Sequence, residues 1–492
     1  MAGPDIAWID EFYGHVKPLI FVRREDSLLI IVPNQAYRLN AGAVRMLERM
    51  GEGEQVGDIL AGFGDTPERR QEVHDFFCDL RAALMGCLRE GTGRRAVELV
   101  PYHLPFNSLP VLSEIALTYR CNLACRFCYA GCTCRRQKEW AWFKKRSAAS
   151  SDAARNTPHL RMRRSSLNRA KKWVHSCFPN RIGAIKNRVH ALINRNVPVF
   201  RGEMRTAEVR RVLDVIWREA QVPSVSFTGG EPVLREDLPK LVRHARSLGM
   251  RVNLITNGTL LTAERVTALA EAGLNSAQVS LESASPAQHD FLTRTPGSWE
   301  ATVAGIEELR RAGITCHTNT TLTALTAPAA PGLVSLACEL GLTRLSMNMV
   351  IPTGSASRDL WLRYSELGPV VEAVRRRART LGVEFLWYSP TPYCLYNPVA
   401  HGLGNKGCAA CDGLLSVSPT GEVLPCSSVP RGVGNLLRRD FRRIWTGRRA
   451  RRWRDKRFAH KTCRACKHFE LCTGGCPIYW KAVGYEELRN AK

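Results

Sequence analysis

LSEIALTYRCNLACRFC, residues 112–128, places a short apolar strand directly before a loop dense in cysteine. Cys121, Cys125 and Cys128 are spaced C-x3-C-x2-C and come immediately after the strand. Structural zinc sites take four ligands, usually as two C-x2-C pairs. Three regularly spaced thiolates in one loop suit instead a four-iron cluster with one iron left open, and an open iron can bind a substrate or cofactor.

Downstream of this loop the chain alternates between predicted strands and predicted helices. Four of the helical stretches close on a glycine, as helix C-termini often do. Repeated βα units predict an α/β fold with a parallel sheet, closed or partly closed into a barrel, and an active face at the carboxyl ends of the strands. The first predicted strand covers residues 112–119. The later ones cover residues 223–229, 251–257, 276–282, 314–322 and 344–350.

Two smaller units flank the barrel, which we expect over residues 112–388. On its N-terminal side, two short apolar strands around a polar turn at 24–27 precede three helices of amphipathic spacing. This order predicts a winged-helix-like module over residues 1–95, joined to the barrel by a polar linker at 96–111. Residues 389–492 consist of loops and turns that carry most of the remaining cysteines.

The composition excludes several classes of protein. With 492 residues and 45% hydrophobic content, the chain can bury a sizeable core, so we expect a globular protein of several domains. No run of about 18 apolar residues could span a bilayer, and the acidic N-terminus lacks the pattern of an export signal. We therefore expect a cytoplasmic protein, in which the 18 cysteines stay reduced and their clustering points to metal.

The formal net charge of +26 is concentrated in two segments. Residues 135–203 interrupt the βα rhythm and begin rich in Ser, Ala and Arg, so we interpret them as a basic insertion. A second basic run covers residues 438–457. Such patches attract polyanions, whether nucleic acid, a membrane surface or an acidic peptide. Neither run shows regular aromatic interleaving, so we expect no nucleic-acid partner, and an RNA-binding protein with structural metal clusters is the alternative.

The GGEP run at 229–232 ends the second predicted strand, and with the cysteine loop it resembles the radical SAM superfamily. The resemblance implies a partial (β/α)6 barrel in which the three loop cysteines hold a [4Fe-4S] cluster, whose open iron binds S-adenosylmethionine (SAM). It implies reductive cleavage of SAM to a 5′-deoxyadenosyl radical, with the protein supplying orientation and the cofactor the hard chemistry. By the resemblance, SAM contacts Gly229, Gly230, Glu231 and Pro232, and also Ser280, Glu282 and Asn319 at later strand ends.

Some of these polar residues have a second interpretation. Ser280, Asn319 and Asn348 could equally be polar ends of strands whose hydrogen bonds are satisfied within the protein. Cys132 and Cys134 follow the cysteine triad. Two ligands do not make a closed metal site, so we interpret these two as spare thiols rather than as a metal pair.

The C-terminal cysteines carry a second resemblance. The spacing C-x2-C-x5-C-x3-C over residues 463–476 matches the core of the SPASM extension, which holds auxiliary iron-sulfur clusters in radical enzymes that modify peptides. The resemblance implies one or two such clusters in a loop-rich iron-sulfur domain that includes a predicted hairpin at 414–426. In the crossed arrangement of that family, one cluster takes Cys408, Cys411, Cys426 and Cys476, and the other takes Cys463, Cys466 and Cys472.

The sequence departs from the SPASM pattern at two points. No cysteine follows Cys476, so the second auxiliary cluster lacks its usual last thiolate. Its remaining iron is then either open or bound by a substitute ligand, which could be Glu486, Glu487 or Cys394 from upstream. Zinc is an alternative for these thiols, because C-x2-C spacing serves zinc equally well. Sulfatase-maturing relatives place a catalytic aspartate just after the hairpin cysteine, where this chain has Ser427, which argues against that reaction.

Residues 37–63, YRLNAGAVRMLERMGEGEQVGDILAGF, resemble the PqqD-like fold, a module that presents leader peptides to maturases. Such modules bind a peptide by adding a strand to a sheet edge, and a plain structural domain is the alternative. Together the resemblances imply a radical SAM enzyme that modifies a ribosomally made precursor peptide with an acidic leader, with a flavodoxin or ferredoxin as electron donor. The alternative among enzymes is cofactor biosynthesis on a porphyrin-like or other small molecule.

Overall fold

The computed structural model describes residues 3–33, 35–84, 106–130 and 202–491. The insertion predicted at 135–203 lies outside these residues except for its last two, and so do Cys132, Cys134 and most of the predicted linker.

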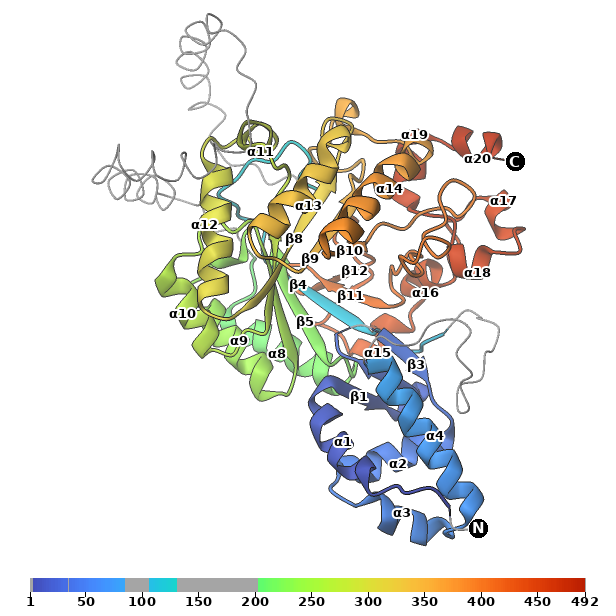
Figure 1. Ribbon diagram of the computed structural model, residues 1–492. Coiled ribbons are helices and arrows are strands. Elements are labelled where there is room, and N and C mark those ends of the chain that lie inside the picture. The colour runs from blue at the N-terminus through green and yellow to red at the C-terminus, as the bar shows by residue number, and fades with distance from the viewer. Residues whose placement is uncertain (1–2, 34, 85–105, 131–201, 492) are drawn as a thin grey trace, which may run out of the picture.

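A large, mostly parallel sheet forms the centre of the molecule (Figure 1). Its strand order, β10-β9-β8-β7-β6-β5-β4-β11-β12-β13, runs through seven consecutive parallel strands of the barrel and continues, by way of the further parallel strand β11, into the C-terminal region. All six predicted strands are present, and the α/β fold with an open, partial barrel is confirmed. The parallel strands are β4 (Leu112–Thr118), β5 (Ser224–Gly229), β6 (Arg251–Thr256), β7 (Ser276–Ser280), β8 (Thr315–Leu322), β9 (Arg344–Met349) and β10 (Glu384–Trp387). The seventh, β10, was not predicted.

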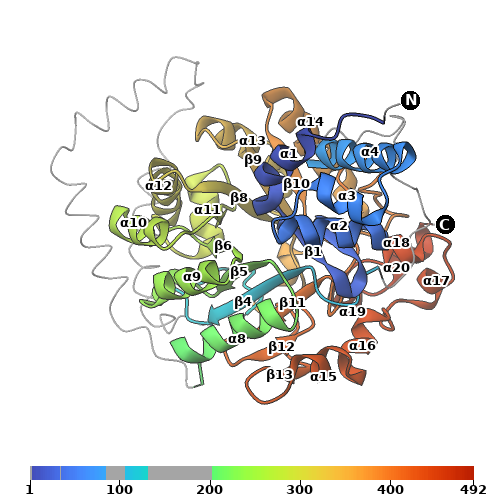
Figure 2. The same ribbon diagram turned by 90° about the horizontal axis from the view of Figure 1, so that it is seen from below.

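Helices cover the outer face of this curved sheet, as Figures 1 and 2 show from two directions. Most of these helices are amphipathic and turn an apolar stripe to the strands; α8, for example, buries Val209, Val212, Leu213 and Ile216. Burying such side chains contributes about 2 kcal/mol each. Helix α11 instead packs against α12 and buries His289, Leu292 and Thr293. The helices are α8 (Thr206–Arg218), α9 (Leu238–Ser247), α10 (Ala263–Glu271), α11 (Pro286–Thr293), α12 (Ser298–Arg311), α13 (Ala330–Glu339) and α14 (Tyr364–Leu381).

The N-terminal module has a three-stranded antiparallel sheet of order β1-β2-β3 packed on helices. The two predicted strands and three predicted helices are present. The structure adds α1 before the two strands and β3 between the strands and the helices; β3, with sequence QAYR, is too short to show apolar alternation. The elements are α1 (Trp8–Val16), β1 (Ile20–Arg23), β2 (Leu28–Ile31), β3 (Gln35–Arg38), α2 (Ala41–Gly51), α3 (Val56–Phe63) and α4 (Pro67–Leu84).

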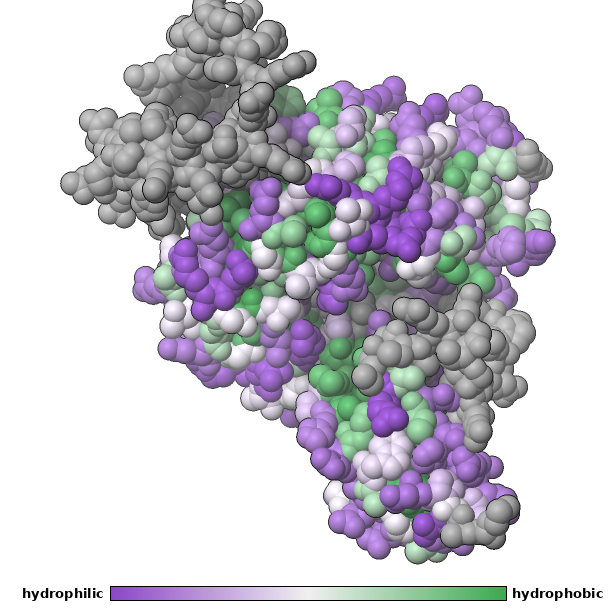
Figure 3. Space-filling model, viewed as in Figure 1, coloured by the Kyte–Doolittle hydropathy of each residue, from purple (hydrophilic) through white to green (hydrophobic). Residues whose placement is uncertain are grey.

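The module is anchored to the large sheet by a buried arginine and an apolar contact. The guanidinium of Arg23, fully buried, donates to the carbonyl oxygens of Pro110 (2.6 Å) and Gln221 (3.3 Å). The rings of Phe21 and Trp217 lie 5.6 Å apart between their centroids. On the face shown in Figure 3, hydrophobic side chains gather where the module meets the large sheet. The two units are therefore held in one orientation by specific contacts.

The C-terminal region extends the large sheet with the predicted hairpin, β11 (Leu414–Val417) and β12 (Glu422–Leu424). β11 pairs in parallel with β4, which places the cysteine-rich loops beside the first strand of the barrel. The other elements here are β13 (Gly434–Asn435), α15 (Phe441–Trp445), α16 (Arg448–Arg454), α17 (Lys461–Arg464), α18 (Phe469–Cys472), α19 (Pro477–Val483) and α20 (Glu486–Asn490).

Five short 3-10 helices complete the described elements: η1 (Lys17–Leu19), η2 (Arg24–Asp26), η3 (Pro232–Leu234), η4 (Ala327–Ala329) and η5 (Arg358–Leu360). In the described part of the chain, none of the helices is both long and apolar enough to cross a membrane.

Candidate active site

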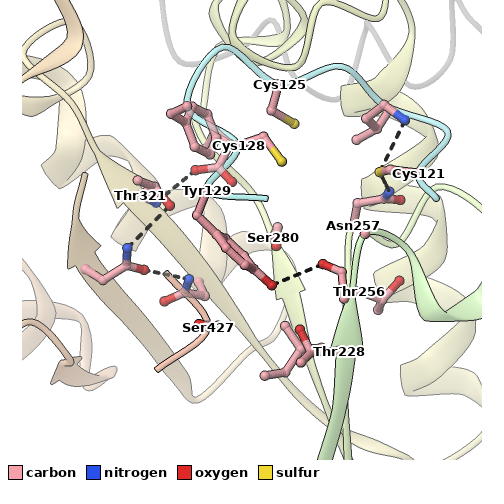
Figure 4. Close-up of a pocket in the computed structure, with 18 of the residues that line it drawn as sticks. Cys121, Cys125, Cys128, Tyr129, Thr228, Thr256, Asn257, Ser280, Thr321 and Ser427 are labelled. Carbon is pink, nitrogen blue, oxygen red and sulfur yellow. Dashed lines mark hydrogen bonds between the residues drawn. The ribbon is translucent and has the colours of Figure 1, made fainter. Parts of the chain in front are cut away.

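A cavity of about 330 Å³ opens at the carboxyl ends of the parallel strands. This is the end at which barrel enzymes place their catalytic groups. The three loop cysteines lie at one end of the cavity, and Thr228 and Ser427 lie at the other (Figure 4). The predicted residues that line it are Cys121, Cys125, Cys128, Gly229, Gly230, Ser280, Glu282 and Asn319. Motifs more than a hundred residues apart in the chain therefore meet in one site.

The three thiols of the loop are close enough to act on one another. Burial raises the pKa of Cys125 well above its ordinary value, and the neighbouring thiols of Cys121 and Cys128 add to that rise. Neighbouring thiols of this kind favour the protonated form unless a cation compensates the thiolate charge. Iron supplies that charge, so this donor set fits a cluster with three cysteine ligands.

The cysteine loop is held in place by backbone bonds to the end of α11. Ala124 N donates to the carbonyl oxygen of Thr293 (3.1 Å), and Arg126 N donates to that of Leu292 (2.8 Å). The loop after β6 holds the other side, where the Asn257 amide donates to Asn122 Oδ1 (3.0 Å). Asn257 Nδ2 also lies 3.9 Å from Cys121 Sγ.

A glycine after β9 closes the loop from a third side. Gly354 has a φ of +60°, and a Cβ there would lie 2.1 Å from the carbonyl oxygen of Cys128, so only glycine fits. Next to it, Ser355 N donates to the same oxygen (2.9 Å). Sequence reasoning missed both Asn257 and Gly354. The available signal was their place near the carboxyl ends of predicted strands, with Asn257 the last residue of one and Gly354 four residues beyond another.

Gly229 and Gly230 bring the end of β5 against β4 at the mouth of the cavity. A Cβ at Gly229, whose φ is +138°, would lie 2.2 Å from the carbonyl oxygen of Thr118. A Cβ at Gly230 would lie 2.2 Å from that of Arg120. The close approach allows Gly230 N to donate to the Thr118 oxygen at 2.7 Å. Glycine is therefore required at both positions, and their backbone forms an edge of the cavity.

Glu231 takes a different position from the one that the resemblance implied. Its carboxylate is fully buried and does not line the cavity, and Pro232 is also buried behind the loop. The Glu231 carboxylate accepts hydrogen bonds from Thr256 Oγ1 (2.8 Å), Asn257 N (2.8 Å) and Val233 N (3.0 Å). Burial raises the pKa of Glu231 to about 7, against these hydrogen bonds, which lower it. Glu231 thus ties the β5 loop to the β6 loop. Contact of SAM with Gly229, Gly230, Glu231 and Pro232 stays a prediction.

We expect Glu231→Ala to lower the free energy of unfolding by roughly 2–4 kcal/mol, because it leaves two buried amides and a hydroxyl without an acceptor. Urea denaturation of the cluster-free protein measures this. Glu236→Ala is the matched control, since Glu236 is exposed in the same segment. Equal midpoints for the two variants would contradict the role given to Glu231.

Polar residues of β8 and β9 line the same cavity as the thiols. Asn319 Nδ2 donates to Asn348 Oδ1 (2.8 Å), so these two amides satisfy one another, as the second interpretation allows. Glu282 accepts from Thr321 N (2.8 Å). Burial raises the pKa of Glu282 to about 8. Contact of these residues with SAM stays a prediction.

Glu114 is a cavity residue that sequence reasoning missed, although it is the one acidic residue in the strand segment LSEIALTY. Its Oε1 accepts from Ser416 Oγ (2.7 Å) on the neighbouring strand β11. Burial raises the pKa of Glu114, while hydrogen bonds from Ser416 and Ser427 lower it. A carboxylate therefore lies in hydrogen-bond contact with Ser427, the residue directly after Cys426 of the hairpin.

The structure also brings the predicted auxiliary thiols together. Three of the four in the first group are buried. Burial raises the pKa of Cys426, and the thiols of Cys408 and Cys476 raise it further. Two members of the basic run at 438–457 turn inward here: Lys456 Nζ donates to the Cys408 carbonyl (2.6 Å) and Arg454 Nε to that of Cys411 (3.2 Å). These cations offset the negative charge of a thiolate-bound cluster.

Comparison with known proteins agrees with this geometry. Residues 175–325 match the radical SAM superfamily, and residues 408–467 match SPASM, an iron-sulfur cluster-binding domain. The chain is 29% identical to the AdoMet-dependent heme synthase of Methanosarcina barkeri, over 61% of this chain and 90% of the synthase. It is 31% identical to the PqqA peptide cyclase of Xanthomonas campestris, over 56% of this chain and 74% of the cyclase.

Two solved structures share the fold. The crystal structure of Streptococcus suis SuiB matches with a TM-score of 0.59 and 16% identity, over 94% of this chain and 96% of SuiB. The structure of anSMEcpe with bound AdoMet matches with a TM-score of 0.51 and 17% identity, over 77% of this chain and 96% of that protein.

The superfamily match begins downstream of the cysteine loop, but the structure joins the two, since β4 and β5 pair in parallel from Ser113 and Val225 onward. The cysteine triad thus belongs to the same sheet as the matched residues. The chain belongs to the radical SAM superfamily and is an iron-sulfur enzyme with a [4Fe-4S] cluster that works with SAM and with auxiliary clusters in a C-terminal SPASM domain.

Proposed function

We propose that this enzyme is a maturase that modifies a ribosomally made precursor peptide. The observation that carries the proposal is the N-terminal module with a sheet edge that can receive a peptide. The likeness to SuiB extends over 94% of this chain and so includes most of that module, and SuiB has also been solved bound to the precursor peptide SuiA. The PqqA peptide cyclases add a sequence relative that acts on a peptide.

In this proposal, residues 1–95 recognise the leader, residues 112–388 carry out the radical chemistry, and residues 389–492 hold the auxiliary clusters. Among the described strands, none pairs with the outer edge of β3. Leu39 N donates to the carbonyl oxygen of Ser27 (2.7 Å), so the alternating backbone groups of Ala36 and Arg38 face away from β2. A leader peptide can pair with those groups as a fourth strand.

The two ends of the cavity suit two tasks. When bound, the cluster and SAM supply a 5′-deoxyadenosyl radical that removes a hydrogen atom from the substrate. Gly229 and Gly230 shape the edge for the cofactor, and Glu114, at the end near Ser427, can accept a proton from the peptide. A flavodoxin or ferredoxin is the proposed electron donor, and the basic surface favours an acidic leader.

The function is tested by anaerobic reconstitution with iron and sulfide, followed by incubation with SAM, dithionite and the short peptide encoded beside the gene. We expect 5′-deoxyadenosine and a mass change in the peptide. A heme-precursor porphyrin is the second substrate to assay, because this chain covers 90% of the Methanosarcina barkeri heme synthase. An unchanged peptide together with a converted porphyrin would replace the proposal with cofactor biosynthesis.

The role of the β3 edge has its own test. We expect Ala36→Pro to weaken binding of the fluorescently labelled precursor peptide by about tenfold, because proline removes an outward N–H and blocks strand addition. Ala36→Ser, which keeps the N–H, is the matched control. SAM cleavage without peptide should be the same in both variants. Equal affinities for the peptide would show that β3 is not the recognition edge.

A further inference from the structure

The second auxiliary group of thiols, Cys463, Cys466 and Cys472, supplies three thiolates, and a closed four-iron cluster takes four ligands. The three belong to the short helices α17 and α18 and the turn between them. Cys466 N donates to the carbonyl oxygen of Cys463 (3.0 Å), which holds the first pair in one tight turn. The neighbourhood of these thiols decides which group can be the fourth ligand.

A turn from the end of the barrel packs directly against Cys472. Tyr393 N donates to Cys472 Sγ (3.3 Å), and Leu395 N donates to the carbonyl oxygen of Pro392 (3.0 Å). Cys394 therefore lies at the tip of a turn whose preceding residue already touches a cluster thiol. The contact is tight: a Cβ at Gly475 would lie 2.8 Å from the ring of Pro392.

This turn is fixed on both of its sides. The Trp387 indole donates to Thr391 Oγ1 (2.9 Å) before the turn, and the Tyr396 hydroxyl donates to Glu372 Oε1 (2.7 Å) after it. The Tyr364 hydroxyl donates to the carbonyl oxygen of Pro390 (2.7 Å) and accepts from Cys476 N (3.0 Å), linking the turn to the loop that ends the cysteine motif. The position of Cys394 is thus set by the fold.

The four thiols also affect one another's pKa values. Burial raises the pKa of Cys463 to about 11, and the thiols of Cys472, Cys394 and Cys466 each add to that rise. The same thiols, Cys472 first, raise the pKa of Cys394 after the larger effect of its burial. These directions agree with the contact between Tyr393 N and Cys472 Sγ, which brings Cys394 next to this group of thiols.

The carboxylates that could have served instead are engaged elsewhere. Glu487 is buried and accepts from Ser365 N (2.8 Å) and from the Tyr479 hydroxyl. Glu486 is 69% exposed and lies 3.8 Å from the guanidinium of Arg363. Neither carboxylate shows a contact with the thiol group.

We propose that Cys394 is the fourth ligand of the second auxiliary cluster. A cluster with four thiolate ligands has no open iron, so it cannot bind the substrate and serves to transfer electrons. The exposure of Cys394 and Cys466 places this cluster near the surface, where a one-electron donor can reach it. The inference rests on the assignment of the other three thiols to a cluster, not on the identity of the substrate.

The test uses the full chain with the cysteine triad replaced (Cys121→Ala, Cys125→Ala, Cys128→Ala), so that only auxiliary clusters assemble. We expect roughly eight irons per chain, from two four-iron clusters. Adding Cys394→Ala should either remove about one of these irons and leave a three-iron cluster with its electron paramagnetic resonance signal, or remove all four irons of this cluster. Cys338→Ala is the control, since Cys338 is an exposed cysteine on α13 and should leave iron and signal unchanged.

A second measurement needs no substitution and covers the case in which a variant fails to fold. In the reconstituted wild type, iodoacetamide should label Cys338 at full rate and Cys394 at least about tenfold more slowly, because a metal-bound thiolate is protected. Removing the iron with a chelator should make both react. Full iron content with Cys394 labelled as fast as Cys338 would overturn the proposal, as would loss of iron in Glu487→Gln but not in Cys394→Ala. Binding of zinc in place of iron would show that these thiols hold no iron-sulfur cluster. Whether the enzyme modifies a peptide is a separate result and does not decide this test.

Discussion

Replacing Cys125 by alanine should abolish SAM cleavage while the protein keeps much of its iron. Cys125 is the middle thiol of the triad that lines the cavity, and no other cysteine among the described cavity residues could take its place. With two ligands left, the cluster that binds SAM cannot form. The auxiliary thiols lie in separate groups beside β11 and α18 and are untouched by the change.

The measurement is 5′-deoxyadenosine released with SAM and dithionite, together with iron per chain. Cys338→Ala is the matched control and should behave as wild type. Cys338 is exposed near the C-terminal end of α13 and does not line the cavity. We expect Cys125→Ala to lose roughly one third of the iron, in line with one cluster of three. SAM cleavage at the wild-type rate would remove the triad from the mechanism.

Replacing Glu114 by glutamine should reduce peptide modification by about 10²- to 10³-fold, the usual contribution of a positioned proton acceptor. The amide keeps the shape and can still bond Ser416, but it cannot take a proton. SAM cleavage in the absence of peptide should continue, because Glu114 lies with Ser427, at the other end of the cavity from the thiols. This prediction depends on the proposed function.

The pH dependence separates a chemical role of Glu114 from a structural one. Burial raises the pKa of this carboxyl above its usual value, so its basic form is reached only at higher pH. Wild-type peptide modification should therefore rise as the pH increases through that raised pKa, and Glu114→Gln should lose this limb of the profile. Glu271→Gln, an exposed change on α10, is the control. A parallel loss of SAM cleavage in Glu114→Gln would indicate damage to the site as a whole.

Local patterns in the sequence predicted most of the fold. The six strands after residue 112 and the hairpin at 414–426 are long or regular enough to show their period, and the glycines mark where helices end. The strands β3 (QAYR) and β10 (EFLW) were missed because each has only four residues and begins with a polar one, unlike the equally short strands β1 (IFVR) and β2 (LLII). Helix α1 was missed because it precedes the first recognisable strand. That β11 joins the large sheet beside β4 could not be predicted, since the two strands are some three hundred residues apart.

The sequence by itself determined which atoms carry the chemistry. The spacing of Cys121, Cys125 and Cys128 and the two glycines of GGEP are local facts, because one short loop must present three thiols and another must approach the backbone of β4. Only the tertiary structure decided the rest. It turned Glu231 from a cavity residue into a link between loops, brought Glu114 to Ser427, and set Cys394 beside Cys472. Each of these contacts joins segments from separate parts of the chain, and pairing across such distances depends on how the packed sheet aligns its loops, which no local pattern encodes.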